Sequence, residues 1–561
     1  MLTLLRGLWG TMMKPVWAPF TGVLMVVLAF APAFAQSVPP SLAAATTPAP
    51  ASPVPAPPVP APPVPAPPVP APPVDESKLG SVFVRCDGLP DKQSAGVVAA
   101  QALLIVATGG ASLLVDRPEL ADVNKRLKGA DGVAACQAAL AKAHDGVRKT
   151  QLGLALSVHD LEAKAYDAAL ADARAAPGLA GDQANDLGFR HSLALSALEL
   201  QAFALVELDR PAEAADTALR MAAAAPYDII IQQRAYRYVA LTSEMSDAKR
   251  AYFDNYVRLD PSALAMRHVA RGWSGDFKGG ASDLEALCAV IEGFVVDKAQ
   301  SPQPNLIAAA AVDAGLAGDQ VHSDALAAQA RAQLDDLVKS GRALSMVPVT
   351  TEGEEMLDLQ AVISALSRGR LAQARAAFAG RSRWISPTPA VVAELDARLR
   401  AGAAAGDLFG PLARDPSIVR AEGLAARAGA IKADPNGVAA LYAAIWAPLK
   451  ADAYTGWSGP IWGARPDAYI VKKTGKEVFN GDTLFISPPN GLPTGEALLL
   501  RAALIAKARS APGFIFLPHR VRLDVDVVRF GAPGDPGFPS EATLDPASVI
   551  AGVSKDIPPP Q

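Results

Sequence analysis

The stretch Leu208-Asp-Arg-Pro-Ala-Glu-Ala214 lies between two helical patterns, and Pro226 follows it. Similar stretches place Ala248 and Ala281 after short polar turns, at spacings of 34 and 33 residues. Alanine is the residue that allows two helix backbones to approach closely, and it is the best helix former. A short helical pair that recurs at a nearly constant spacing predicts stacked helix–turn–helix units, because one pair cannot bury its apolar face alone.

This pattern resembles the tetratricopeptide repeats (TPR). In that family a helix ends at Gly or Asp, a short turn follows, an alanine opens the core face of the second helix, and a proline closes a repeat of about 34 residues. The resemblance covers residues 147–435, and outside the three central copies the spacings stretch to 45, 44 and 49. It implies a TPR-like α-solenoid whose concave face binds a peptide or another protein. The expected packing alanines are Ala169, Ala214, Ala248, Ala281, Ala325 and Ala374.

Composition agrees with a mainly helical chain of 561 residues. Half of the residues are apolar, only 6% are aromatic and 19% are charged, and alanine is abundant. Such material favours close-packed helices over strands, in which alanine is depleted. The net charge of −4 excludes a generally basic nucleic-acid binder.

The N-terminal 35 residues have the features of a secretory signal peptide. Arg6 and Lys14 precede an apolar run that ends in Ala33-Phe-Ala35, a small-x-small cleavage site. We expect cleavage after Ala35 and a periplasmic or secreted protein. The alternative is an uncleaved anchor, since about 20 apolar residues could span a bilayer, and only then would the chain contact a membrane.

Residues 36–74 form a Pro/Ala-rich linker that cannot bury apolar surface and is expected to be disordered or extended. A helical segment is expected over 75–146, before the repeats over 147–450. In an oxidising compartment Cys86 and Cys136 should form a disulfide, the alternative being two buried thiols. Cys288 should be a core residue.

No catalytic, cofactor-binding or metal-binding motif is present. The six histidines form no HExxH pair, the three cysteines have no CxxC spacing, and phosphate-binding glycine loops are missing. We therefore expect no cofactor, no metal site and no enzymatic activity.

The chain changes character near Tyr454. Short β-rich runs at 469–472, 483–486, 513–517 and 521–527 surround one helix that includes Leu498–Ile505. They predict a small α+β module over 451–551, followed by a disordered tail over 552–561. Trp446, Trp457 and Trp462 lie at its start, either as a stacking platform for sugars or a peptide, or as cement between two domains.

Two hypotheses of function result. The first is an exported scaffold whose repeats bind another envelope protein or a peptide. The alternative is an envelope enzyme or a cell-wall-binding protein whose site lies in the C-terminal module.

Overall fold

The computed structural model describes residues 80–91, 123–294, 303–381, 383–434, 437, 438, 441, 458, 459, 461, 462, 476–480, 483–487, 495–518 and 526–560. The predicted signal peptide, the linker, Trp446 and Trp457 lie outside these residues. Within them the chain is mainly helical, as predicted from the composition, and it also contains one small sheet.

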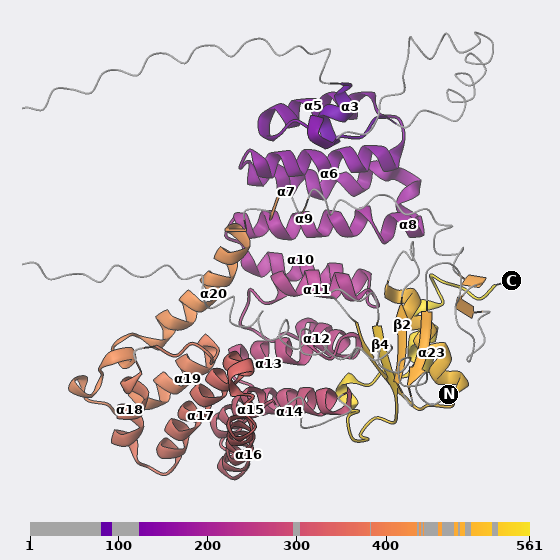
Figure 1. Ribbon diagram of the computed structural model, residues 1–561. Coiled ribbons are helices and arrows are strands. Elements are labelled where there is room, and N and C mark those ends of the chain that lie inside the picture. Colours follow the sequence, from indigo (N-terminus) through magenta and orange to yellow (C-terminus); the bar gives the residue numbers. More distant parts are fainter. Residues whose placement is uncertain are drawn as a thin grey trace, which may run out of the picture.

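Most helices form one stack in which neighbours in the chain pack side by side (Figure 1). Its helices are α6 (Gly146–Glu162), α7 (Tyr166–Ala175), α9 (Leu193–Glu207), α10 (Pro211–Ala224), α11 (Ile229–Val239), α12 (Asp247–Leu259), α13 (Ala263–Ser274), α14 (Phe277–Phe294), α15 (Pro304–Leu316), α16 (Gln320–Lys339), α17 (Val347–Ser367) and α18 (Leu371–Gly380). They pair as successive hairpins. The short α8 (Leu187–Arg190) precedes α9.

The tight turns within these hairpins share one geometry. A residue with positive φ ends the first helix at Lys164, Asp209, Gly275, Gly318 and Gly369. The amide of the next residue then bonds back to the last turn of that helix, as Arg210 N does to Leu205 O at 2.9 Å. This is the usual left-handed termination of a helix, which glycine adopts without strain.

The fifth residue after each left-handed residue is small and buried. These residues are Ala169, Ala214, Gly280, Ser323 and Ala374. Ala281, next to Gly280, is buried too. Four of the six predicted packing alanines, at 169, 214, 281 and 374, therefore lie in the core as expected.

The other two predictions, Ala248 and Ala325, are wrong, since both are exposed. Ser323 takes the packing position in α16 and donates to Ala311 O at 2.7 Å, and Ala325 lies two residues further round the helix. Ala248 is exposed because the α11–α12 turn is longer, over residues 240–246, and has no left-handed residue.

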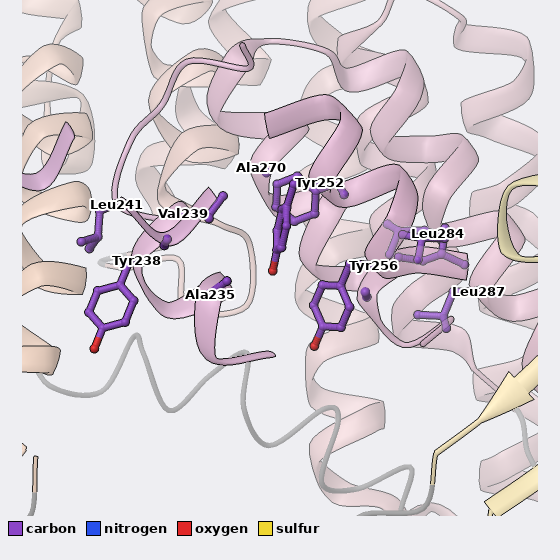
Figure 2. Close-up of a cluster of buried hydrophobic side chains, with 14 of the residues drawn as sticks. Ala235, Tyr238, Val239, Leu241, Tyr252, Tyr256, Ala270, Leu284 and Leu287 are labelled. Atoms are coloured by element: carbon purple, nitrogen blue, oxygen red, sulfur yellow. The ribbon is translucent and has the colours of Figure 1, made fainter. Parts of the chain in front are cut away.

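Aromatic side chains fill the core at α12 instead of alanine. Tyr252, Phe253 and Tyr256 are buried between α11, α13 and α14 (Figure 2). The Tyr252 and Phe253 rings meet edge to face at 5.1 Å, and Tyr252 Oη donates to Gln232 O at 2.6 Å. Because large rings fill the space between α11 and α12, no small residue is needed where these two helices meet.

The N-terminal helices cover one end of the stack. They are α3 (Val82–Asp87) and α5 (Gly129–Lys142), which pack with α6 around Cys86 and Cys136. Of the helical segment predicted over 75–146, the structure describes residues 80–91 and 123–146, and these contain α3 and α5.

After α18 the chain returns along the stack. Helix α19 (Pro389–Arg400) contacts α13, and α20 (Pro416–Lys432) runs along one edge of the stack from α13 towards α9 (Figure 1). Its contacts follow the turns inside successive hairpins: Lys432 bonds Asp209, and Arg427 bonds Ala240 O.

The sheet contains β1 (Lys476–Asn480), β2 (Thr483–Ser487), β3 (Phe514–Leu517) and β4 (Asp526–Phe530), all antiparallel in the order β1-β2-β4-β3. The strands predicted at 483–486 and 513–517 match β2 and β3, and the predicted helix is α23 (Gly495–Ala508). Their core is shared with the stack, because Ile229, the first residue of α11, and Leu259, the last residue of α12, pack into it.

The C-terminal tail differs from the predicted disorder over 552–561. Helix α24 (Pro546–Val553) packs on α23, and Ile557 is fully buried in the same core. Burial of this apolar residue removes surface from water and so helps to hold the tail against the sheet core.

Candidate interaction surface

The predicted Cys86–Cys136 disulfide is confirmed, with the two Cα atoms 4.6 Å apart. It joins α3 to α5 at the covered end of the stack. Cys288 is free and buried in α14, as predicted. Burial raises the pKa of its thiol to about 12, so the thiol stays protonated and unreactive.

His159 lies directly behind this disulfide. Its Nε2 donates to Cys86 O at 2.7 Å, and its Nδ1 is 3.0 Å from Glu162 Oε2. Burial of Glu162 is outweighed by hydrogen bonds from His159, Arg126 and the Gly129 amide, which lower the pKa of Glu162 to about 2. The arrangement anchors α3 and the loop before α5 onto α6.

Among the described residues, Cys86, Cys136 and His159 form a group close enough to hold a metal ion. Zinc would need thiolates here, whereas the two sulfurs are bonded to each other. In the oxidised chain this group is therefore a structural link.

Trp462 is half-buried at the edge of the sheet core. Its Nε1 donates to Ile557 O at 2.9 Å, and Ser458 Oγ donates to Pro558 O nearby. The indole thus attaches the C-terminal tail, which favours the cementing role over the stacking platform for this residue. The hypothesis for Trp446 and Trp457 concerns residues outside the described ones.

A buried charge network that sequence analysis missed connects α13, α14 and α15. Arg267 holds Asp283 through both its Nε and its Nη2, the latter at 2.7 Å, and also bonds Asp254. His268 Nδ1 lies 2.9 Å from Asp313 Oδ2. Burial alone would lower the pKa of His268, but Asp313 reverses the effect and raises it.

The close approach at this network depends on Gly280. A Cβ atom there would lie 2.4 Å from Asp313 Oδ2. In the sequence these residues look like ordinary surface charges on amphipathic helices. Only the four-residue spacing of Arg267 and Arg271, on consecutive turns, indicates that these two face a common neighbour, which is Asp283.

Among the described residues, three exposed apolar side chains follow one another closely in the chain at a place that we call the α16–α17 corner. It consists of Val338 at the end of α16, Leu344 in the 3₁₀ turn Ala343–Met346, and Val347 at the start of α17. Leu344 is 90% exposed and Val338 is 65% exposed. Exposed apolar side chains that gather in one place are a feature of protein-binding surfaces.

The comparisons with known proteins do not extend this description. No family model matches the chain, and neither a curated protein nor a solved structure is significantly similar to it. Among the described residues, no helix is both long and apolar enough to cross a membrane.

Proposed function

We propose that this protein is an exported, TPR-like helical-repeat scaffold that binds another envelope protein. The observation that supports it best is the recurring hairpin unit, in which a left-handed residue is followed five positions later by a small buried one. Repeated units of this kind build an α-solenoid, whose extended surface commonly serves to bind proteins. The small sheet with α23 is the C-terminal module of this scaffold.

Two further observations favour export. The N-terminal sequence has the pattern of a signal peptide, and the Cys86–Cys136 disulfide is a feature of oxidising compartments. Sequencing of the mature N-terminus should start at Gln36. A mature chain that retains Met1 would contradict cleavage and favour a membrane anchor.

The α16–α17 corner is the proposed contact with the partner protein. Val338, Leu344 and Val347 would lose exposed apolar surface on binding, at about 25 cal/mol per Å². Such a gain is independent of charge and suits a partner that presents its own apolar patch.

A photo-reactive residue at position 344 tests this proposal in cells that export the full chain. We expect a crosslinked heterocomplex, which Val338→Glu should abolish. The same residue at position 213, on the exposed face of α10, is the matched control and should give no such complex. Absence of a crosslink at 344, or an equal yield at 213, would refute the corner as a partner site.

A further inference from the structure

Helix α20 lies against a face of the stack that is centred on Trp273. We call it the α20 face and define it by Asp209, Ala240 and Trp273, which come from three successive hairpin turns. The indole of Trp273 is fully buried. The guanidinium carbons of Arg420 and Arg427 lie 5.3 and 5.2 Å from its centroid.

The contacts of α20 form a regular pattern along the helix. Arg420 donates to Trp273 O, and Arg427 donates to Ala240 O at 2.8 Å. Gly423 lies between them, where a Cβ atom would come within 2.9 Å of the Trp273 ring. Lys432 bonds Asp209 at 2.6 Å. The face therefore recognises a helix that carries four residues at fixed intervals. Counted from a first arginine, a small residue follows after three positions, a second arginine after seven and a lysine after twelve.

Helix α20 itself contributes little apolar surface to this docking. Among the 17 residues of α20, Ile431 alone is buried. By contrast, all 13 residues of α15 are buried in the stack. Because apolar burial is the main source of helix docking energy, α20 is held far less firmly than the helices of the hairpins.

The charges at the contact are also incompletely paired. Neither Arg420 nor Arg427 has a carboxylate partner among the described residues, although Arg427 is half-buried. Lys249, itself buried, donates to Thr242 O at 2.8 Å beside the Ala240 carbonyl that Arg427 uses. Burial, and then the nearby Arg427, lower the pKa of Lys249 to about 8. Buried cations without a counter-ion oppose docking.

One polar atom of the face is left unused by α20. The Nε1 donor of Trp273 is buried and has no acceptor among the described residues. A buried donor without an acceptor costs roughly 1–3 kcal/mol. A helix that supplied an acceptor here would fit the face better than α20 does.

From these contacts we infer that α20 is a displaceable occupant of the α20 face, and that a partner helix with the same arginine, small residue, arginine and lysine spacing, and with an acceptor for Trp273 Nε1, competes for it. This inference deepens the proposed scaffold function and rests on it. Because α20 is tethered to the stack, its high effective concentration would keep the face closed until such a partner arrives.

A fluorescein-labelled peptide of residues 414–434 serves as the probe, with the full mature chain as receptor. The unchanged chain should bind it weakly, since α20 already occupies the face. Arg420→Ala with Arg427→Ala should bind it at least tenfold more tightly. Arg414→Ala with Glu422→Ala is the matched control, because this pair joins α20 to the segment just before it and both side chains are exposed, and the control should bind like the unchanged chain.

A peptide with lysine at both arginine positions should lose most of its affinity, because lysine lacks the planar group that stacks on an indole. Equal binding of the first peptide by the unchanged chain and the double variant, with the variant folded, would overturn the inference. So would equal binding of the two peptides.

Hydrogen exchange in the unchanged chain gives a second test that needs no variant. Amides of α20 should exchange at least a hundredfold faster than those of α9 and α10, through local opening. If the amides of α20 exchange only when those of α9 do, the inference is overturned. This test still applies if the double variant fails to fold, because it uses the unchanged chain. Neither test uses an envelope partner, so their failure is distinguishable from failure of the crosslink at position 344.

Discussion

At the scale of single residues, the left-handed residue of each tight turn determines which residue of the next helix meets the previous one. Asp209 turns the chain by a fixed amount, and Ala214 arrives at the helix contact one turn into α10. The same geometry brings Ala374 to its contact after Gly369. A side chain larger than alanine at these positions would push two backbones apart.

Replacement of Ala214 by Glu should therefore destabilise the protein by about 3 kcal/mol or more, because it buries a charge and overpacks the contact between α9 and α10. Ala248→Glu is the control. Ala248 is exposed in the first turn of α12, where a carboxylate is favourable. Chemical denaturation measures both variants, and similar losses would contradict the assigned faces.

Asp160 makes stability depend on pH. Burial, with a hydrogen bond to Asp172 and its charge, raises the Asp160 pKa to about 7. Since the unfolded pKa is about 3.9, the folded chain binds more protons between these values, and stability falls as pH rises through this window. Asp160→Asn should raise the thermal midpoint by a few degrees at pH 8 and little at pH 4. Asp167→Asn, at an exposed position, should show no such pH difference.

At this scale the sequence predicts types of residue better than positions. Ala169, Ala214 and Ala374 were found because their turns are short and of equal length. Ala248 and Ala325 were misplaced because counting from alanine to alanine ignores the longer turn before α12 and accepts only one small residue type. Counting five residues from the left-handed residue gives Ser323 in α16, in place of Ala325. In α14 the same count gives Gly280, next to Ala281.

At the scale of helices and strands, the contact between α14 and α15 at Asp313 depends on one glycine. Gly280 faces the buried Asp313 carboxylate, and the adjacent Gly279 faces only the ends of the Arg271 and Asp276 side chains, which can move. The two glycines differ in surroundings but not in intrinsic helix propensity.

Gly280→Ala should accordingly cost about 2 kcal/mol, the usual range for an overpacked core. Gly279→Ala should be neutral or stabilise by up to about 1 kcal/mol, since alanine is the better helix former. Thermal unfolding of both variants checks the difference. A gain in stability at position 280 would show that α15 can move away at no cost.

The elements themselves were predicted more successfully than their partners. Alternating and apolar runs identified β2, β3 and α23, because these patterns depend on neighbours in the chain. The burial of Ile557 against α23 depends on contacts with distant residues, and so does the sharing of Ile229 and Leu259 with the sheet core. No local pattern carries that information.

At the scale of the whole molecule, the C-terminal third of the chain returns along both edges of the central stack. Helix α20 follows the turns within hairpins, and the sheet with α23 and α24 covers turns between hairpins. The stack is thus held from two sides by segments that come last in the chain. Their attachment decides how much of the stack a partner could reach.

A histidine at the second of these edges connects the stack to the C-terminal segments. His191 Nε2 is 3.3 Å from Asp556 Oδ2, and its Nδ1 is 3.8 Å from Glu496 Oε2 in α23. Arg190 and Asp228 also face it from the stack. Burial opposes the charged ring, but the hydrogen bond to Asp556 and the two carboxylates prevail and raise the His191 pKa.

The His191 contact should hold the C-terminal segments most firmly at mildly acid pH. A raised histidine pKa contributes stability that is complete below the unfolded value of about 6.5 and is lost as pH rises through the folded value. The lowered pKa of Asp556 contributes stability that is present above its unfolded value of about 3.9 and is lost as the pH falls below that value.

Amides of α23 should therefore exchange more slowly at pH 5.5 than at pH 8, after correction for the intrinsic rate. His191→Gln should remove most of this difference, because glutamine cannot carry the charge that the two carboxylates stabilise. His322→Gln, which breaks only the exposed pair with Glu285, should leave it in place. A pH difference that survives in His191→Gln would place the responsible group elsewhere, with His268 beside Asp313 as the next residue to change.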